Sequence, residues 1–475
     1  MKEKDVYSND VIVEGLRACE NKRNKSFVES SIGIYEKLHG RKPDTMFMSA
    51  LGTVLENFRQ WRHANLVEAT NQASFPALRD YGFELITALF PGLIANEIFT
   101  IQPAKFKNFS IFYQTFKYQT AKGITPANTP NFDALKYFPI DQNYTLDSEV
   151  NKVIGTGTGA TAAFSYNPAP FRPLVPGTVS VTSINTANAA MALVDNGTGT
   201  MVGDGTGSVD YTTGVIAVTF NANVKSGAPV LSSYQFIGEG SKENAAELGL
   251  TITEIQGQAK ERRLRYNFSI ESQFSYRQQW GRSMDADLLA AAMAEIRKEI
   301  DQDLIQLGNT TALDPASAGS VVWNRTPDVG VQYFFWREQF IDTLNAAGNL
   351  IVKATGFGEG NIVVGGLNFK QIVEIIGPRF TPSGVAGVKG SRFIGTIDGT
   401  RRCYYDPSLS DNQFFVTYKS PNPLEPGIVY SPWMPLFASD PHMLADGSLH
   451  RYLITSTGKT VINKKLFAAG TIVQS

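Results

Sequence analysis

The chain has 475 residues, 43% of them hydrophobic and 18% charged, so its length predicts two to four folding units. Its 43 Lys and Arg residues balance 44 Asp and Glu residues, which argues against nucleic-acid affinity from an overall positive field. No run approaches the roughly 18 apolar residues of a membrane-spanning helix. Cys19 and Cys403 lie far apart in sequence, which indicates neither a disulfide scaffold nor a thiolate metal site.

The N-terminal segment is polar and favours helices. Its first residues are charged and are not followed by the apolar core of a secretory signal, so we expect synthesis in the cytoplasm. Apolar residues then recur at helical spacing: Met46, Met48, Leu51, Val54, Leu55 and Phe58. The pattern predicts an arm or short helical subdomain, and the change in character at Phe75, with turn signals at Pro91 and Gly92, marks the start of a compact core.

An interrupted β-hairpin is predicted next. Residues 109–118 are aromatic and β-prone, which favours a strand. Between about 120 and 240, short strand-like runs alternate with turn signals such as Asp195-Asn196-Gly197, which is typical of a small β-sandwich or immunoglobulin-like module. The runs cover residues 177–184, 190–194, 208–211, 215–220 and 229–236. Prolines at its entry, glycines at its exit and strand patterns on both sides predict an insertion into the hairpin.

A strand and a long helix follow the insertion. Apolar residues from Leu264 to Ile270 alternate with polar ones from Arg265 to Glu271, which predicts a half-buried strand. Ser283 is a candidate N-cap, and an apolar stripe from Leu289 to Leu307 ends at Gly308. This is the strongest predicted helix of the chain, with a length of roughly 36 Å at 1.5 Å per residue.

The remaining chain has the pattern of a mixed α/β domain. We expect helices over 334–355 and 368–376, and a buried strand over 362–365. Further strands are predicted over 393–397, 402–405 and 414–418, and a β-prone run covers 451–472.

The residue types that carry catalysis or bind metals form no recognisable site. The four histidines, His39, His63, His442 and His450, have no ligand spacing. Residues 155–159 lack the spacing and the following helix of a phosphate-binding loop, and Asp195, Asp204 and Asp210 do not match an EF-hand. We interpret these residues as turns and packing groups, and we expect no catalytic residue, cofactor or metal.

Several segments resemble the major capsid proteins of T4-like myophages, within the tailed-bacteriophage HK97-fold family. They are Phe90 to Pro103, Thr253 to Glu271, Asp285 to Leu304, Gly356 to Asn361, Tyr418 to Asn422, Gly427 to Pro432, and Asp440-Pro441. They occur in the order that they have in the family, and the resemblance that they mark extends over about two thirds of the chain.

The resemblance implies an α+β, HK97-like capsid fold with a peripheral domain built on a long spine helix, an axial α/β domain and an extended loop with an inserted β-sandwich or Ig-like domain. The expected parts are an N-terminal helical arm (1–88), a peripheral domain (89–118 and 245–315), an extended loop (119–244) whose inserted β domain covers about 168–238, an axial domain (316–440), and C-terminal strands that return to the peripheral domain (441–475).

The function that this resemblance implies is structural. The chain would self-assemble into hexamers and pentamers of an icosahedral head shell around phage DNA, as a virion protein made in the host cytoplasm. Its partners would be further copies of itself, the portal, vertex, scaffold and decoration proteins, and double-stranded DNA at the inner surface, with no membrane and no enzymatic activity. The alternatives are an encapsulin-like bacterial compartment shell and a surface adhesin that uses the β module.

Lys260, Arg262, Arg263 and Arg265 are the candidate residues for contact between subunits. Strand alternation places Arg263 and Arg265 on one face and Arg262 on the other. These cations could bind acidic groups of a neighbouring subunit, face packaged DNA, or simply lie at a solvated strand edge, where charge discourages unwanted pairing.

Overall fold

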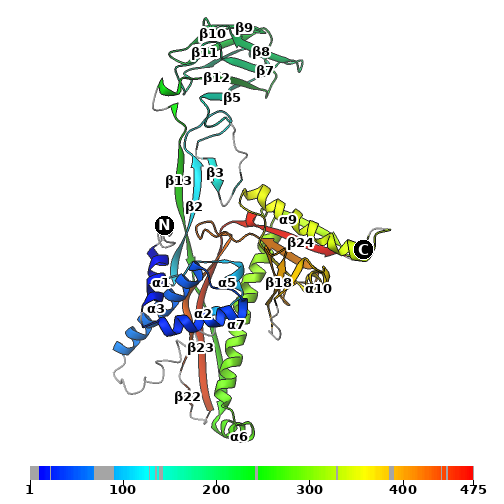
Figure 1. The fold of residues 1–475 in the computed structure, drawn as a ribbon. Coiled ribbons are helices and arrows are strands. Elements are labelled where there is room, and N and C mark those ends of the chain that lie inside the picture. The colour runs from blue at the N-terminus through cyan, green and yellow to red at the C-terminus, as the bar shows by residue number, and fades with distance from the viewer. Residues whose placement is uncertain are drawn as a thin grey trace. The chain divides into compact units, whose positions relative to one another are not determined.

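The computed structural model describes residues 10–21, 23–68, 90–127, 129–133, 136–137, 143–240, 244–327, 330–383, 390–439, 441–444 and 448–473. The predicted boundary at Phe75 and Asp440 of the last matching segment lie outside these ranges. The chain divides into two compact units: unit 1 comprises residues 1–114, 134–136 and 252–475, and unit 2 comprises 115–133 and 137–251. Unit 1 contains both helices and strands, and the described part of unit 2 consists mainly of strands, so the predicted α+β class is confirmed (Figure 1). The division into five parts stays a prediction.

Three helices open the chain: α1 (Asp10–Glu20), α2 (Lys25–His39) and α3 (Thr45–Glu68). The apolar spacing predicted α3 correctly, because Leu51, Val54, Leu55 and Phe58 are buried in the main core of unit 1. Two short elements follow, η3 (Phe90–Gly92) and α5 (Ala95–Ile98), and both are buried.

The long helix of unit 1 is α7 (Met284–Leu313), and it lies beside a five-stranded sheet (Figure 1). The sheet has the order β1 (Thr100–Ile101), β21 (Ile428–Ala438), β23 (Ser448–Val461) and β14 (Lys260–Ser269), with β22 (His442–Met443) paired to β23. The buried side chains of α7 include Ile296, Ile300 and Leu304, three members of the predicted apolar stripe.

Two predicted boundaries near α7 are wrong. Gly308 does not end the helix, because it serves close packing: a Cβ there would lie 3.0 Å from the rings of both Phe99 and Phe415. The strand before α7 ends at Ser269, and Ile270 already belongs to α6 (Ile270–Trp280). The Ser269 hydroxyl accepts the backbone N–H of Ser272 at 3.1 Å, so this serine caps α6. Ser283 does occupy the N-cap position of α7, although its side chain makes no capping hydrogen bond.

A second sheet of unit 1 has seven strands. Its order is β15 (Gly319–Asn324), β24 (Phe467–Val473), β20 (Gln413–Thr417), β16 (Ile362–Gly365), β19 (Arg401–Tyr405), β18 (Arg392–Ile397) and β17 (Phe380–Pro382). The helices α8 (Tyr333–Glu338), α9 (Phe340–Thr355) and α10 (Leu367–Ile375) accompany it. The predicted helix over 334–355 is therefore two helices, and the mixed α/β pattern is confirmed.

The extended hairpin consists of β2 (Asn108–Tyr118) and β13 (Leu248–Gln258), and β3 (Thr129–Asp133) and β4 (Lys136–Tyr137) continue their sheet in the order β13-β2-β3-β4. The hairpin predicted on both sides of an insertion is confirmed.

Within unit 2, eight antiparallel strands form one hydrogen-bonded path. The order is β5 (Ser148–Thr156), β12 (Pro229–Gln235), β7 (Ser180–Ile184), β8 (Ala190–Asp195), β9 (Thr200–Gly203), β10 (Gly205–Asp210), β11 (Val215–Phe220) and β6 (Ala163–Tyr166). Val181, Leu193, Ile216 and Val230 belong to a hydrophobic core of its own. All five predicted runs contain strands, and the sheet begins at Ser148, earlier than the predicted start near residue 168.

Asp195 and Asp210 of this sheet are turn residues. The Asp195 carboxylate is buried and accepts the backbone N–H of Gly177 at 2.7 Å and the hydroxyl of Tyr211 at 2.9 Å. Asp204 accepts the N–H of Ala192 at 2.9 Å. Asp195 also accepts the N–H of Gly197 at 3.1 Å, and Asp210 accepts the N–H of Thr212 at 2.9 Å. These local hydrogen bonds support the interpretation of Asp195 and Asp210 as turn-forming groups, whereas Asp204 contacts a neighbouring strand.

Candidate inter-subunit contact site

The four basic candidates lie on β14, and the strand separates Arg262 from Arg263 and Arg265 as alternation predicts. Arg262 is half-buried on the face that also carries Leu264, Tyr266 and Phe268. Lys260, Arg263 and Arg265 are exposed. Arg262 is therefore placed to make contacts within its own chain, whereas the other three candidates are open to solvent.

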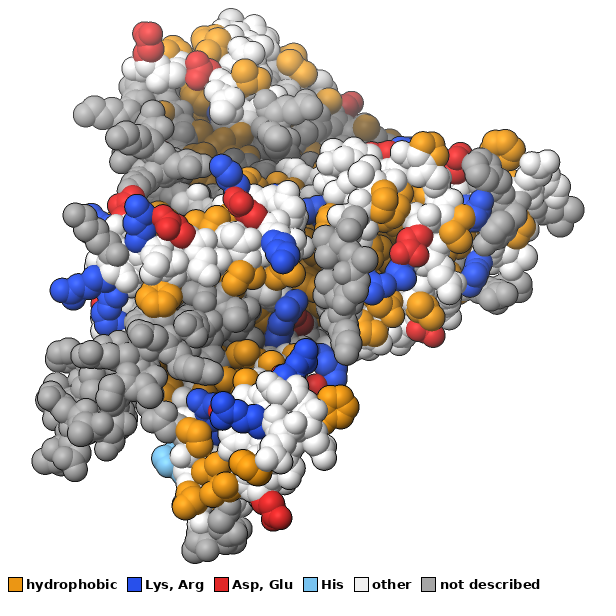
Figure 2. Space-filling view, turned by 60° about the horizontal axis from the view of Figure 1, so that its bottom comes forward, with side chains coloured by type: hydrophobic (Ala, Val, Ile, Leu, Met, Phe, Trp, Pro, Cys, Tyr) orange, Lys and Arg blue, Asp and Glu red, His pale blue; other side chains and the backbone are white. Residues whose placement is uncertain are grey.

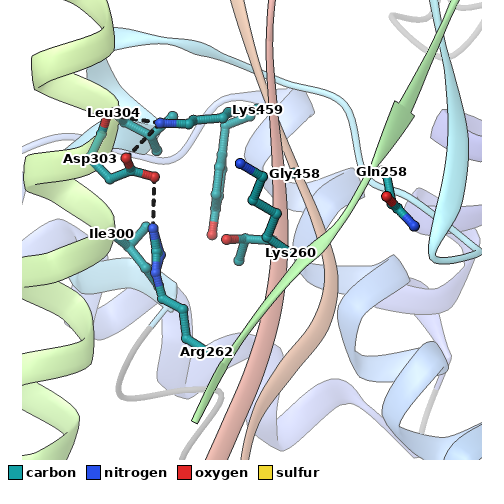
Figure 3. A pocket seen from close by; sticks show the side chains of 10 residues that line it. Gln258, Lys260, Arg262, Ile300, Asp303, Leu304, Gly458 and Lys459 are labelled. Carbon is teal, nitrogen blue, oxygen red and sulfur yellow. Dashed lines mark hydrogen bonds and ion pairs between the residues drawn. The ribbon is translucent and has the colours of Figure 1, made fainter.

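Arg262 is held by an aspartate of α7. Its guanidinium donates to Asp303 Oδ2 at 2.7 Å, and Lys459 of β23 donates to Asp303 Oδ1 at 2.5 Å (Figure 3). Partial burial by itself raises the pKa of Asp303, but the hydrogen bonds from Lys459 and Arg262 outweigh it and lower that pKa. One carboxylate of the long helix thus joins two neighbouring strands.

A second aspartate repeats the arrangement near the start of α7. Asp285 Oδ1 accepts the Tyr266 hydroxyl of β14 at 2.8 Å, and Asp285 Oδ2 accepts the Arg451 guanidinium of β23 at 2.6 Å. Burial raises the pKa of Tyr266, and its hydrogen bond to Asp285 adds to the rise. Asp285 and Asp303 together fix the β14–β23 pair along α7.

A small hollow lies beside the Asp303 ion pairs. It has a volume of about 100 Å³, and Figure 3 shows Arg262 and Lys459 meeting at Asp303 within it, whereas Gln258 lies away from the carboxylate. Its lining residues are Gln258, Lys260, Arg262, Ile300, Asp303, Leu304, Tyr430, Thr457, Gly458 and Lys459. The volume is well below the roughly 300 Å³ at which small-molecule pockets begin.

The exposed members of the cluster differ in their partners. The side chain of Arg263 is 66% exposed and donates to Glu261 at 2.9 Å, whereas Arg265 has no ion-pair partner within the described ranges. On the face drawn in Figure 2, Lys and Arg side chains are interspersed with acidic and hydrophobic ones. Such an arrangement favours local binding to acidic groups over binding through a continuous positive electrostatic field.

The structure also contains a buried charge network that the sequence did not indicate. The side chain of Glu97 on α5 accepts hydrogen bonds from Arg41, from Arg402 at 3.0 Å and from the hydroxyl of Tyr35. Burial raises the pKa of Glu97, while the cations of Lys419 and Arg402 oppose that rise. Because its members come from distant parts of the chain, the network ties the N-terminal helices to the seven-stranded sheet.

The histidines do not form a site in the described part of the chain. His39 contacts the Pro91 carbonyl at 3.0 Å, and burial lowers the pKa of its imidazole to about 4. His450 is buried beside Ser448, His442 is exposed on β22, and the side chain of His63 lies outside the described residues. Across the described ranges, no three His, Cys, Asp or Glu side chains are placed to share a metal ion, and no helix is long and apolar enough to cross a membrane.

Solved shell proteins show a distant structural likeness. The capsid of Myoviridae phage XM1 matches with a TM-score of 0.34 at 11% identity, over 49% of this chain and 80% of that one. The holo-SrpI encapsulin complex from Synechococcus elongatus PCC 7942 matches with a TM-score of 0.32 at 12% identity, over 47% of this chain and 77% of that one.

The chain also has sequence relatives, which are major capsid proteins of phages. The major capsid protein of Enterobacteria phage T4 is 28% identical over 225 residues, which cover 42% of this chain and 43% of that protein. The major capsid protein of Vibrio phage KVP40 is 25% identical over 250 residues, or 48% of each chain. The matched segments thus span less than half the length of these relatives. The family described as "Major capsid protein Gp23" matches residues 77–463. The chain therefore belongs to the Gp23 family of major capsid proteins, as its resemblance to the T4-like head proteins predicted.

Proposed function

We propose that this chain is a shell-building subunit that assembles into hexamers and pentamers of a phage head around double-stranded DNA. Membership of the Gp23 family supports a virion location and synthesis in the host cytoplasm. The proposal includes no enzymatic activity. Portal, vertex, scaffold and decoration proteins are its proposed further partners.

The observation that carries this proposal is the apolar face of the hairpin strand β13. Leu248, Leu250 and Ile252 occupy alternate positions and are 56%, 56% and 55% exposed. Residues two apart on a strand share a face, so these side chains form one apolar stripe. The strand β13 lies at the edge of its four-stranded sheet, and an exposed apolar stripe on an edge strand marks a surface that another chain covers.

A second copy of the chain is the proposed cover for this stripe. A contact between a hairpin of one copy and a different surface of the next is heterologous, and such contacts close into rings or propagate into larger assemblies. We therefore propose that the hairpin lies over the adjacent subunit, while the domain of the seven-stranded sheet faces the centre of each capsomer.

Substitution of the stripe tests this function. Leu248→Glu together with Leu250→Glu places two carboxylates where an apolar partner surface should lie, and we expect closed shells to be lost. Electron microscopy and sedimentation velocity would measure assembly, and the matched control, Leu248→Met with Leu250→Met, should still form shells. Normal shells from the Glu variant would refute the role of the stripe.

The exposed cations of β14 are proposed to contact a neighbouring subunit. Arg265 and Lys260 have free charges in the described structure, and Arg263 has only an exposed partner, so acidic groups of another copy could bind all three. Arg262 is excluded from this role by its ion pair with Asp303. Arg263→Glu should weaken assembly; unchanged assembly would favour a solvated strand edge, and loss of DNA retention alone would favour a contact with DNA.

The eight-stranded sheet of unit 2 is proposed to clamp neighbouring capsomers or to decorate the shell. Its two ends are adjacent, since the N–H of Phe236 donates to the carbonyl of Asp147 at 3.0 Å. A deletion of residues 148–235 closed by a short Gly-Ser linker therefore removes the whole sheet, β5 and β6 included. If this variant forms shells of normal thermal stability, the sheet does not clamp neighbouring capsomers, and the proposed role as a surface decoration remains.

A further inference from the structure

Helix α6 is an unusual element because none of its 11 residues is buried. It nevertheless carries large apolar side chains: Ile270 is 49% exposed, Phe274 is 64% exposed and Trp280 is 69% exposed. A surface helix of a globular protein normally turns such residues toward its own core. The exposure of two aromatic rings on one short helix therefore points to a partner surface.

The large apolar residues of α6 lie on one side of the helix, with Arg277 among them. At 3.6 residues per turn, Ile270, Phe274, Arg277 and Trp280 fall within an arc of about 120° on the helix surface. We call these four residues the α6 stripe. Met443 of the neighbouring strand β22 and Leu444 are 64% and 47% exposed and add apolar surface nearby. Figure 2 shows hydrophobic and basic side chains side by side at the lower end of unit 1, where Figure 1 places α6 and β22.

Exposed arginines flank the stripe, and the acidic Glu271 lies in the first turn of the same helix. Arg277, within the stripe, and Arg282, just after the helix, are exposed, and Arg265 of β14 is exposed close to the start of α6. Salt bridges within the described ranges do not engage any of these three arginines. Arginine and tryptophan are the residue types that most often dominate the binding energy of protein interfaces.

The adjacent helix α7 presents the opposite charge. Its solvent face carries Asp287, Glu295 and Glu299, separated by exposed alanines at positions 290, 291 and 294. Asp287 accepts the hydroxyl of Tyr276 from α6 of the same chain at 2.8 Å, so Glu295 and Glu299 are the acidic groups proposed for contact with a second copy. Lys298 is 49% exposed and pairs with Glu295 at 3.3 Å, a surface contact that exchanges at little cost. With Lys298 included, this face retains a net negative charge, so the chain carries a matched acidic surface for the arginines in and beside α6.

We propose that α6 is an interface in which the α6 stripe and Arg277 and Arg282 of one copy pack on the acidic solvent face of α7 of a second copy. This inference rests on the proposed shell function and assigns a contact within it. The small alanine side chains of α7 leave room for Phe274 and Trp280, and the glutamates face the arginines.

The composition of the surface favours protein over DNA as its occupant. Duplex DNA is bound mainly through phosphate contacts to basic and polar groups, and these contacts do not require exposed aromatic rings. Phe274 and Trp280 contribute most of the exposed apolar surface of α6. A second copy of the chain offers both kinds of contact: the alanines of its α7 can pack against the aromatic rings, and its glutamates can pair with the arginines.

A charge-swap experiment on the full chain tests the contact. Arg277→Glu with Arg282→Glu should raise the protein concentration needed for shell assembly by about tenfold, because like charges then meet across the interface. Adding Glu295→Arg and Glu299→Arg to the same chain reverses both sides and should restore assembly. Lys353→Glu, on an exposed site of α9, is the matched control and should leave assembly unchanged.

A second variant separates the possible outcomes. Phe274→Ser with Trp280→Ser removes no charge, so it should impair assembly equally if α6 binds protein and should have no effect if α6 binds DNA. Far-ultraviolet circular dichroism should show unchanged folding, since these residues are not buried. If the wild-type chain forms no shells, the proposed function fails. If the wild type assembles and the arginine and aromatic variants assemble equally well, or lose only DNA retention, this inference alone is overturned.

Discussion

Asp303 shows how one side chain can set the geometry between two strands and a helix. Its carboxylate accepts Arg262 and Lys459 from neighbouring strands, so its removal leaves two cations close together in a half-buried site. Because the Asp303 side chain is 41% exposed, solvent screens much of this repulsion. We expect Asp303→Asn to lower the free energy of unfolding by about 1 kcal/mol.

Urea unfolding of the unassembled chain would measure this change. Glu261→Gln is the matched control, since it breaks the exposed pair with Arg263 and should cost much less. The difference between the two variants should shrink as salt is added. Equal effects at low salt would mean that Asp303 is not a structural link.

Asp301 makes the stability of unit 1 depend on pH. The side chain is buried and accepts the N–H of Ala95 at 3.0 Å, and burial raises its pKa to about 7. Arg297 lowers this pKa and Asp406 raises it. The folded state then binds a proton more tightly than the unfolded state, whose carboxyl has a pKa near 3.8. Asp301 therefore stabilises the fold below about pH 4, and this contribution is lost as the pH rises to about 7.

We expect Asp301→Asn to remove this pH dependence, because the amide oxygen can still accept the N–H of Ala95. Unfolding free energies of the unassembled chain between pH 4 and 8 would show it as a flatter profile, with a difference from wild type of at most about 4 kcal/mol. Asp287→Asn, on the exposed face of the same helix, should keep the wild-type slope. If the unfolding free energy of Asp301→Asn keeps the wild-type dependence on pH, another group is responsible for that dependence.

At the scale of elements, two helical glycines have opposite roles. A Cβ at Gly308 in α7 would lie 3.0 Å from two aromatic rings, whereas at Gly33 in α2 it would meet no atom within 4 Å. Gly33→Ala should therefore stabilise the chain by about 0.5–1 kcal/mol through helix propensity. Gly308→Val should destabilise it by about 1–3 kcal/mol through overpacking. Thermal unfolding would compare them, and a stabilising Gly308→Val would contradict the packing described for α7.

Patterns that act within one element were predictable from the sequence. Alternation separated Arg262 from Arg263 and Arg265, and the apolar stripe located α7. The strand β21 was missed because Pro432 and Pro435 interrupt its pattern; the structure accommodates this segment with register shifts after Pro432 and Met434. The alternating strand pattern continues through Ile270 in the sequence. The strand nevertheless ends at Ser269, because the Ser269 hydroxyl accepts the N–H of Ser272 and caps α6.

Contacts between distant segments were not predictable. Glu97 meets Arg402 across 305 residues and Arg41 across 56, and neither partner stands in a local pattern that identifies it. For the same reason the sequence did not identify the partner of Arg262, because Asp303 lies 41 residues further on in a different element. Alternation could therefore assign Arg262 and the pair Arg263 and Arg265 to opposite faces of the strand, but the structure was required to show which face is internal and that Asp303 is the partner of Arg262.

At the scale of the whole molecule, the central claim is that the chain builds a shell from copies of itself. Family membership, the exposed stripe of β13 and the unburied helix α6 all support surfaces that another copy completes. The most direct test is electron microscopy of the purified chain, expressed alone and with the other head proteins of its phage. The proposed function predicts closed or tubular shells of hexameric capsomers. A dispersed monomer under every assembly condition would contradict it.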